Sequence, residues 1–225
     1  MIAAQRTLFV GDVHGCLDEL QALLKKLAPS SADRLIFVGD LVAKGPDSEG
    51  VVALVRELGA QSVLGNHDDA VLRYRRAQQS GKEPRLKPGH LAVARSLSEA
   101  DWAWLEQRPL FLRVPEHNVA VVHAGVVPGK ALEAQARDDL LAMRTLRPDG
   151  SASSRMEDGD LWTAHYKGPE HVVFGHNAIT GLQRTSFASG LDTGCVYGRA
   201  LTALVLPENT LVSVVAKRAY KDIGP

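Results

Sequence analysis

The stretch TLFVGDVHGCLDELQALLKKL, residues 7–27, decides the fold of this chain. Its apolar run at 7–10 ends at Gly11 and predicts a short buried strand. Leucines then recur at spacings of three and four residues as far as Leu27. This spacing predicts an amphipathic helix that ends before Pro29.

The segments that follow repeat this order of a strand and a helix. Apolar runs predict strands at 35–38 and 62–64, and the positions between them predict a helix that includes residues 51–58. A further helix is expected over 69–79. This alternation is the βαβ pattern that is typical of an α/β fold.

The second half of the chain follows the pattern more loosely. Apolar runs at 111–114 and 119–122 flank the sequence Pro-Glu-His-Asn, which predicts a hairpin and therefore antiparallel pairing. Other elements are expected as helices over 99–107 and 132–143, as strands at 172–174, 191, 201–206 and 211–215, and as loops over 80–90 and 147–160, the second of them mobile. No linker divides the chain, so one domain over residues 1–225 is expected.

The composition is that of an ordinary globular chain. Its 225 residues are 45% hydrophobic and 23% charged, and 26 Lys and Arg balance 26 Asp and Glu. This balance gives no general attraction to nucleic acid or anionic membranes, so any anion site must be local. A cytoplasmic protein with no membrane partner and no obligate protein partner is expected, since neither a membrane span nor a signal peptide is evident. Cys16 and Cys195 form no disulfide framework, which fits a reducing compartment.

Ligand-type residues follow five of the predicted strands. In each case the chain has a glycine at or beside the end of the strand, together with Asp, Asn or His. The five motifs are Gly11-Asp12-Val13-His14-Gly15, Gly39-Asp40, Gly65-Asn66-His67-Asp68, His123-Ala124-Gly125 and Gly175-His176. Because α/β sheets form their sites at the carboxyl ends of strands, these side chains are expected to share one crevice.

The chemistry of this set indicates a pair of divalent metal ions. Taken singly, a Gly-Asp after a strand is more often a turn, and a lone histidine is more often a structural residue. Five turns that all present oxygen or imidazole ligands indicate one metal centre instead. Two cations about 3.5–4 Å apart need a bridging carboxylate and several N and O ligands, and together they activate a water molecule against a phosphoryl group.

The order and spacing of the motifs resemble the phosphoprotein-phosphatase branch of the calcineurin-like metallophosphoesterases. Three sequence motifs of the chain are most similar to those of the ApaH-like phosphatases and diadenosine tetraphosphatases of that branch. They are Leu41-Val42-Ala43-Lys44-Gly45-Pro46, the His-Ala-Gly form of the fourth motif, and Leu191-Asp192-Thr193-Gly194-Cys195. The resemblance implies an α/β fold built as a mixed β-sandwich flanked by helices, with a two-metal site on the loops at the strand ends.

The resemblance also implies a role for individual residues. One metal ion would be held by Asp12, His14 and Asp40, and the second by Asp40, Asn66, His123 and His176, with Asp40 bridging the two. His67 would be the general acid at the leaving group, and Lys44 would steady charge on the phosphoryl group. The two divalent ions would be manganese, zinc, iron or cobalt, since ligands of this kind discriminate little among them.

The chain departs from the protein-phosphatase pattern just after the bridging carboxylate. Those enzymes continue with an Asp and an Arg, where this chain has Ala43 and Lys44. Without the carboxylate, His67 loses a partner that favours its imidazolium form, so proton donation to a poor leaving group weakens. A serine alkoxide needs that proton, whereas a nucleotide phosphate, with a second pKa of about 6, leaves with little help. The change therefore favours phosphoanhydride substrates.

Candidate substrate-binding residues lie outside the metal motifs. Arg144 or Arg147 is a candidate to hold a non-reacting phosphate, with a surface ion pair as the alternative. Tyr197 and Tyr166 are candidates to stack on a nucleobase, with ordinary packing as the alternative. A local excess of positive charge would attract a polyphosphate or form a solvated helix face. It comprises Arg73, Arg75, Arg76, Lys82, Arg85 and Lys87.

The sequence therefore predicts a metal-dependent hydrolase of phosphoanhydride bonds. The expected substrates are dinucleoside polyphosphates, or a related polyphosphate or the capped 5′ end of an RNA. The chain is shorter between the fourth and fifth motifs than the diadenosine tetraphosphatases that it resembles, which favours a more open site. Two alternatives stay open, namely a serine, threonine or tyrosine protein phosphatase with the same metal site, and a non-catalytic module that senses nucleotide or polyphosphate.

Overall fold

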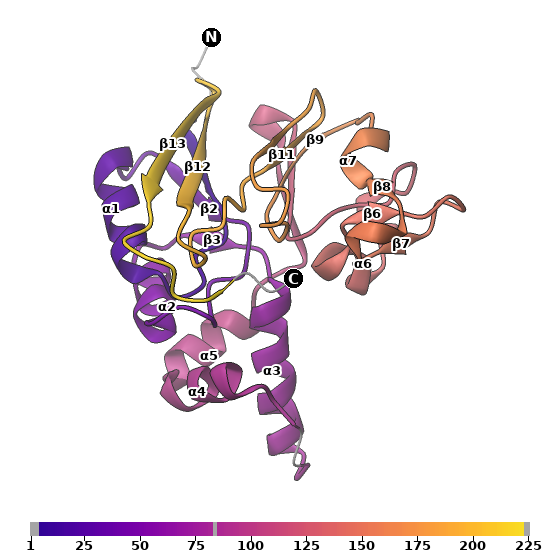
Figure 1. Cartoon of the computed structure of the whole chain (residues 1–225). Coiled ribbons are helices and arrows are strands. Elements are labelled where there is room, and N and C mark those ends of the chain that lie inside the picture. Colours follow the sequence, from indigo (N-terminus) through magenta and orange to yellow (C-terminus); the bar gives the residue numbers. More distant parts are fainter. Residues whose placement is uncertain (1–4, 83–84, 223–225) are drawn as a thin grey trace.

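The structure, a computed structural model, describes residues 5–82 and 85–222. Two five-stranded sheets face each other across a buried core, and helices cover their outer faces (Figure 1). This arrangement confirms the mixed β-sandwich flanked by helices that the sequence predicts.

The first sheet contains the strands of the N-terminal βαβ pattern. Its order is β13 (Thr210–Val215), β12 (Ala200–Leu206), β1 (Thr7–Val10), β2 (Arg34–Phe37) and β3 (Gln61–Ser62). β1, β2 and β3 are parallel, whereas β12 runs antiparallel to both of its neighbours. The carboxyl ends of the three parallel strands therefore meet at one edge of this sheet.

The second sheet combines the expected hairpin with parallel strands. Its order is β10 (Gln183–Arg184), β11 (Ala188–Gly190), β9 (His171–Phe174), β5 (Val119–Val122) and β4 (Phe111–Val114). β4 and β5 form the antiparallel hairpin, and the turn between them contains the 3₁₀ helix η1 (Pro115–His117). β5, β9 and β11 are parallel to one another, so this sheet also gathers strand ends at one edge.

Alternate side chains of a strand enter different cores. In β1, Phe9 points between the sheets and belongs to one cluster with Val121 and Val173 of the second sheet. Leu8 and Val10 point the other way, into the core beneath the helices of the first sheet. Successive side chains of a strand alternate between its two faces, and here both faces are buried. This double burial explains why the strand sequences are apolar without interruption.

Seven α-helices lie in the described part of the chain. α1 (Leu17–Leu27) and α2 (Ser48–Glu57) cover the first sheet, and α6 (Arg137–Ala142) and α7 (Trp162–His165) cover the second. α3 (Asn66–Gln79), α4 (Pro88–Ser96) and α5 (Glu99–Glu106) form a further group, which Figure 1 shows below the sheets. α3 packs against both α4 and α5.

One helix begins earlier than the sequence predicts, and another was not predicted. α3 begins at Asn66 rather than near residue 69, because the Asp68 carboxylate accepts a hydrogen bond from the backbone N–H of Gly65 and so caps the helix start. α4 begins at Pro88, within the loop expected over 80–90, of which residues 83–84 lie outside the described chain. The fixed φ of proline suits the first position of a helix.

Two further predictions are corrected between the fourth and fifth motifs. The helix expected over 132–143 is interrupted, because the side chain of Gln135 bonds backbone groups of Val127 and Lys130, and Ala136 is extended. Only η2 (Leu132–Ala134) and α6 are helical there. The loop expected over 147–160 contributes instead to a small antiparallel sheet, whose members are β7 (Ala152–Ser153), β6 (Thr145–Leu146) and β8 (Asp160–Leu161).

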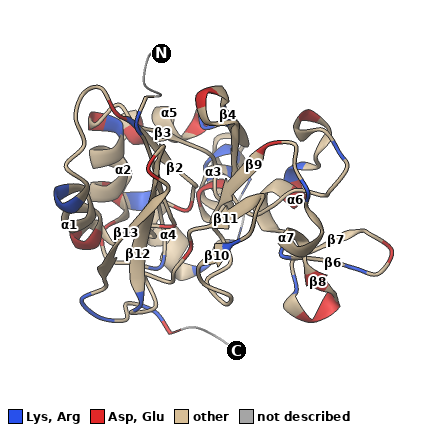
Figure 2. Cartoon of the chain, turned by 90° about the horizontal axis from the view of Figure 1, so that it is seen from above, with Lys and Arg blue, Asp and Glu red and all other residues tan. Residues whose placement is uncertain are grey.

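The surface carries both signs of charge. Figure 2 shows Lys and Arg interspersed with Asp and Glu along the chain, in keeping with the formal net charge of zero. Within residues 5–82 and 85–222, no helix combines the length and the apolar character that crossing a membrane requires.

Candidate metal centre and active site

The six predicted metal ligands come from the loops at the strand ends of both sheets. Asp12 and His14 follow β1, Asp40 follows β2, Asn66 opens α3, His123 follows β5 and His176 follows β9. The structure brings all of these side chains into one buried cluster. The βαβ pattern and the second sheet are thus both needed to build the site.

Two glycines allow the loops to come this close. A Cβ atom on Gly175 would lie 1.9 Å from Oδ1 of Asp12, and one on Gly65 would lie 2.2 Å from Oδ1 of Asp40. Both separations are far shorter than a van der Waals contact, so a larger residue would displace the carboxylates. The glycines of the third and fifth motifs therefore belong to the site for steric reasons.

Several non-glycine residues of these loops have a left-handed backbone. The φ angle is 50° at His14 and Asp40, 70° at Ala43 and Lys44, and 67° at His176. Such conformations cost about 1–3 kcal/mol each and concentrate at functional sites, where the surrounding structure enforces them. The concentration of five such residues here indicates that these loops are shaped for function.

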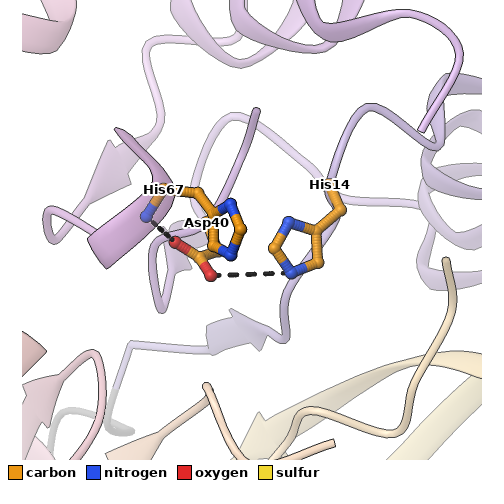
Figure 3. A group of neighbouring side chains, drawn as sticks. All are labelled: His14, Asp40 and His67. Carbon is orange, nitrogen blue, oxygen red and sulfur yellow. Dashed lines mark hydrogen bonds and ion pairs between the residues drawn. The ribbon is translucent and has the colours of Figure 1, made fainter. Parts of the chain in front are cut away.

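Asp40 occupies the middle of the cluster. Its Oδ2 lies 3.5 Å from Nε2 of His14 and 3.4 Å from Nε2 of His123, so one carboxylate faces both sides of the site. Its Oδ1 accepts a hydrogen bond of 2.8 Å from the backbone N–H of His67. Figure 3 shows His14, Asp40 and His67 together, with dashed lines from the Asp40 carboxylate to the backbone nitrogen of His67 and to the ring of His14. This is the geometry expected of a bridging ligand.

The side of the cluster away from His14 is built around Asn66. The Oδ1 atom of Asn66 lies 3.0 Å from Nε2 of His123 and 2.9 Å from Nδ1 of His176. Asp12 approaches from β1, and its carboxylate accepts hydrogen bonds from the backbone N–H of His176. Asp40, His123 and His176 also have ligand atoms within 4.8 Å of one another.

The three histidines of the predicted ligand set are oriented by backbone carbonyls. His14 and His123 donate through Nδ1 to the carbonyls of Val42 and Val38, and His176 donates through Nε2 to that of Ala142. A carbonyl only accepts, so each of these ring nitrogens carries a proton. The opposite nitrogen of each ring then faces the cluster and offers a lone pair to a cation when the ring is neutral, which is the arrangement that metal-binding histidines require.

The charges of the cluster also fit bound cations. Burial and the negative charges of Asp192 and Asp40 raise the pKa of Asp12 well above its usual range. Burial lowers the pKa of His14 and of His176 far below the ordinary value, so both rings are neutral. Although burial opposes it, the carboxylate of Asp40 raises the pKa of His123 to about 9. Neutral imidazoles beside crowded carboxylates are ligands that a divalent cation would stabilise.

His67 pairs with a histidine that the sequence did not single out. Nδ1 of His67 and Nε2 of His90 share a hydrogen bond of 2.9 Å, and the two rings are stacked with centroids 4.9 Å apart and an interplanar angle of 9°. On its other side, the His67 ring meets that of His14 edge to face at 5.0 Å. Burial, with the charge of Lys44, lowers the pKa of His67 to about 4. His67 therefore stands between the metal cluster and α4.

Lys44, Tyr197 and Arg144 lie beside the cluster. Nζ of Lys44 donates to Nε2 of His14 at 2.9 Å and lies 5.3 Å from the ring centre of Tyr197. Arg144 donates to the carbonyl of Ser154 at 2.8 Å, and its buried Nε atom has no hydrogen-bond partner among the described residues. Lys44 and Arg144 thus adjoin His14 and His176 of the cluster, and Tyr197 lies beside Lys44.

Other candidates have partners of their own. Arg147 donates to Asp158 at 2.8 Å, the surface ion pair that was its alternative role, and it directly follows β6 of the small third sheet. Tyr166 packs edge to face on Trp162 and donates to a backbone carbonyl. Arg73 and Arg75 of the basic stretch form ion pairs with Asp69 and with Glu99.

Three residues of the site were missed or given no role by sequence reasoning. Asp68 accepts hydrogen bonds from the backbone N–H groups of Leu41 and Val42 and so ties the Asp40 loop to α3. Burial raises the pKa of Asp192 beside the cluster. Both residues belong to motifs that were recognised, and that signal was sufficient to find them. His90 had no such signal, because its position depends on how α4 packs against α3.

A cluster of carboxylate, amide and imidazole ligands around a bridging aspartate, at the strand ends of a β-sandwich, defines a metal-dependent phosphoesterase. The sequence model of the calcineurin-like phosphoesterase family matches residues 5–210, and the chain belongs to that family.

Its curated relatives include two kinds of bis(5′-nucleosyl)-tetraphosphatase. The chain is 31% identical to the asymmetrical enzyme PrpE of Oceanobacillus iheyensis, over 94% of this chain and 92% of that protein. It is 35% identical to the symmetrical enzyme of Shewanella baltica, over 83% of this chain and 70% of that protein. The resemblance seen in the motifs is therefore confirmed across most of the chain.

Solved structures agree with this assignment. One that is provisionally described as a diadenosine tetraphosphatase superposes with a TM-score of 0.86 at 39% identity, covering 96% of this chain and 95% of the other. A protein-tyrosine phosphatase of a Shewanella species superposes with a TM-score of 0.58 at 18% identity, which shows a shared fold.

Proposed function

We propose that the protein hydrolyses a phosphoanhydride bond of a dinucleoside polyphosphate such as diadenosine tetraphosphate. A related polyphosphate or the capped 5′ end of an RNA presents the same bond. The observation that carries this choice is the partner of His67, which is an imidazole and not a carboxylate. A general acid without a carboxylate partner is suited to a leaving group that needs little protonation, and a nucleotide phosphate is such a group. The curated relatives support the same substrate class.

Two divalent cations are the proposed cofactors, and the donor set fits them. Asp12, His14 and Asp40 would hold one, and Asp40, Asn66, His123 and His176 would hold the other. Manganese, zinc, iron and cobalt all suit these N and O donors. When bound, such a pair would activate water and neutralise charge on the phosphoryl group.

The protein's own side chains would position the substrate and move one proton. Lys44 would contact the oxygens of the attacked phosphoryl group. Water adds to phosphorus and loses a proton to solvent as the bond from phosphorus to the bridging oxygen breaks, and that oxygen leaves with the electron pair of the broken bond. His67 in its protonated form would deliver a proton to it from Nε2, while His90 at Nδ1 holds the ring in place. His90 is thus a positioning residue.

The remaining contacts are assigned to residues around the cluster. Arg144 is proposed to bind a non-reacting phosphate, and the Tyr197 ring to contact a nucleobase. Arg147 stays a weaker candidate for a phosphate at the rim, because it is already paired with Asp158. The whole chain is proposed to act as one domain, since both sheets supply ligands to one site. It is also proposed to act in the cytoplasm, without a membrane or an obligate protein partner.

Product analysis tests the proposed function. The manganese-loaded protein is incubated in parallel with diadenosine tetraphosphate, inorganic polyphosphate and a phosphoserine peptide, and the products are separated by chromatography. ADP alone from the dinucleotide would establish symmetrical cleavage, and ATP with AMP asymmetrical cleavage. Turnover of the phosphopeptide alone would replace this proposal with a protein phosphatase. Bound metal without any turnover would mean a binding module.

A further inference from the structure

A groove with a volume of about 720 Å³ opens beside His67, on the side away from the metal cluster. Its lining runs from Lys44 and Pro46, past His67, to the first turns of α4, and it also includes Lys221 near the C-terminus. It is continuous with the site through Lys44 and His67.

The charge of the groove is positive. Lys44, Lys87 and Lys221 contribute to its lining, and none of the described residues that line it is an Asp or a Glu. Lys87 stands at the N-cap of α4, where the helix dipole adds partial positive charge. Elsewhere on this surface the two signs are interspersed, so three lysines without a facing carboxylate distinguish the groove.

Apolar surface lies next to these charges. Pro46, Pro88 and Val93 form part of the same lining. A groove with charged groups at one place and apolar walls at another suits a ligand that has an anionic chain and a flat apolar part. An inorganic phosphate would use only the charges, and a nucleoside would use only the walls.

We propose that this groove binds the departing nucleotide, with Lys44 and Lys87 on its phosphates and the apolar wall against its nucleoside. The inference rests on the proposed function, and it adds where the leaving group is held. His67 contacts His14 of the metal cluster on one side and His90 of the groove wall on the other. His67 also lines the groove itself, so a nucleotide whose oxygen it protonates lies next to the groove. The ligand class is a nucleoside diphosphate or triphosphate.

The test compares Lys87→Glu with Lys82→Glu in the manganese-loaded protein. Both lysines are exposed and lie close together in sequence, but Lys82 does not line the groove. The inhibition constant of ADP is measured against the dinucleotide, with pyrophosphate and adenosine as parallel inhibitors. Lys87→Glu should raise the inhibition constants of ADP and pyrophosphate about tenfold, since reversing one exposed charge changes an ion-pair contribution of this order. Lys82→Glu and the adenosine arm should show no change.

The outcomes separate this inference from the proposed function. Failure of the wild-type protein to hydrolyse the dinucleotide overturns the proposed function; direct titration with ADP then tests the groove by the same two variants. Equal effects of the two substitutions would show that ADP responds to the overall charge of this surface and not to a contact in the groove. That result would overturn the proposed binding site. Binding of pyrophosphate as tightly as ADP would overturn the nucleotide assignment, because it would leave the apolar wall without a role. Unchanged thermal unfolding of both variants confirms that neither substitution disturbs the fold.

Discussion

Three histidine side chains of the metal centre are held in one orientation before any ligand arrives. Each uses one ring nitrogen to bond a backbone carbonyl, so its other nitrogen is committed to the cluster. Side chains fixed in this way lose little conformational freedom on binding, which favours tight metal binding. The same carbonyls lie in or beside the loops that the short motifs define.

Asp12→Asn tests the metal assignment at this scale. The substitution removes a negative charge but keeps the shape, so the protein should fold while turnover of the proposed substrate falls about a thousandfold or more. Steady-state kinetics at saturating manganese measure the loss, and metal analysis after dialysis measures the occupancy. His123→Ala should act in the same direction. Near-normal turnover in either variant would remove these residues from the metal centre.

Ala43 and Lys44 are the residues expected to set the preference for anhydrides. Ala43 is buried with a φ of 70°, a conformation that Asp tolerates better than most residues. The double substitution Ala43→Asp with Lys44→Arg should raise the ratio of kcat/KM for a phosphoserine peptide to that for the dinucleotide. The variant with Asn in place of Asp is the matched control, because it lacks the charge that favours an imidazolium. An unchanged ratio in the Asp variant would contradict the argument.

The proximity of the six candidate ligands could be predicted from the sequence, because they lie within contiguous motifs. The six ligands were expected together because each follows a strand, and parallel strands bring their ends to one edge. Arg144 and Tyr197 were placed near the cluster, whereas Arg147 turned toward Asp158. The sequence could not distinguish Arg144 from Arg147, since both follow the same helix and only tertiary contacts separate them.

At the scale of elements, α4 completes the site without contributing a metal ligand. It provides His90 as the partner of His67, and its first turn lines the groove. The Gly, Pro, Lys and Arg residues over 80–90 predicted a surface loop, and no helix was predicted at α4. A helix of this size is stabilised mostly by packing, here against α3, which sequence periodicity does not report.

His90→Ala should reveal the positioning role of α4. Loss of the hydrogen bond frees the His67 ring, so kcat should fall about tenfold for phenyl phosphate, a poor leaving group that needs its proton. The change should be much smaller for p-nitrophenyl phosphate, and KM should be unaffected for both. His90→Gln, which retains a hydrogen-bonding side chain, should recover part of the loss. Equal losses on the two esters would mean that His90 has only a structural role.

Ser98 is expected to stabilise α5 by capping it. The Ser98 hydroxyl accepts a hydrogen bond from the backbone N–H of Asp101. The Asp101 carboxylate in turn accepts a hydrogen bond from the backbone N–H of Ser98. Ser98→Ala should lower the free energy of unfolding by about 1 kcal/mol, as loss of an N-cap does. Urea denaturation measures this change, with Ser31→Ala as an exposed control, and kcat should stay at the wild-type value. A midpoint equal to that of the control would show that the cap contributes nothing.

The elements of the fold that were predicted well are those with an unbroken pattern. β1, α1 and the hairpin of β4 and β5 follow their apolar periodicities closely. The helix expected over 132–143 was wrong in extent because Gln135 competes for backbone groups, a contact that no periodicity encodes. The small third sheet was missed for a related reason, since strands of two residues are too short to show alternation.

At the scale of the whole molecule, the metal centre connects the two sheets. One ligand set from the first sheet and another from the second converge on Asp40, so bound cations would stabilise the sandwich as well as the site. Removal of metal with a chelator should therefore lower the Tm by about 5–10 °C, the effect expected when a ligand at a hundred times its Kd is lost from a chain of this length. Differential scanning fluorimetry with and without added manganese measures the shift. In His123→Ala the shift should shrink, and an undiminished shift would place the metal elsewhere.

The separation of the metal loops from α4 has an evolutionary consequence. The ligands lie at the strand ends, where their loops need closely packed glycines and residues with a left-handed backbone. Selection would therefore remove almost any substitution among them. α4 and its N-cap contribute His90, Lys87 and a short apolar wall. Replacing this helix would leave the metal ligands intact. A lineage could therefore exchange one leaving group for another by remodelling a nine-residue helix. The same boundary is a natural place for an engineer to graft new specificity.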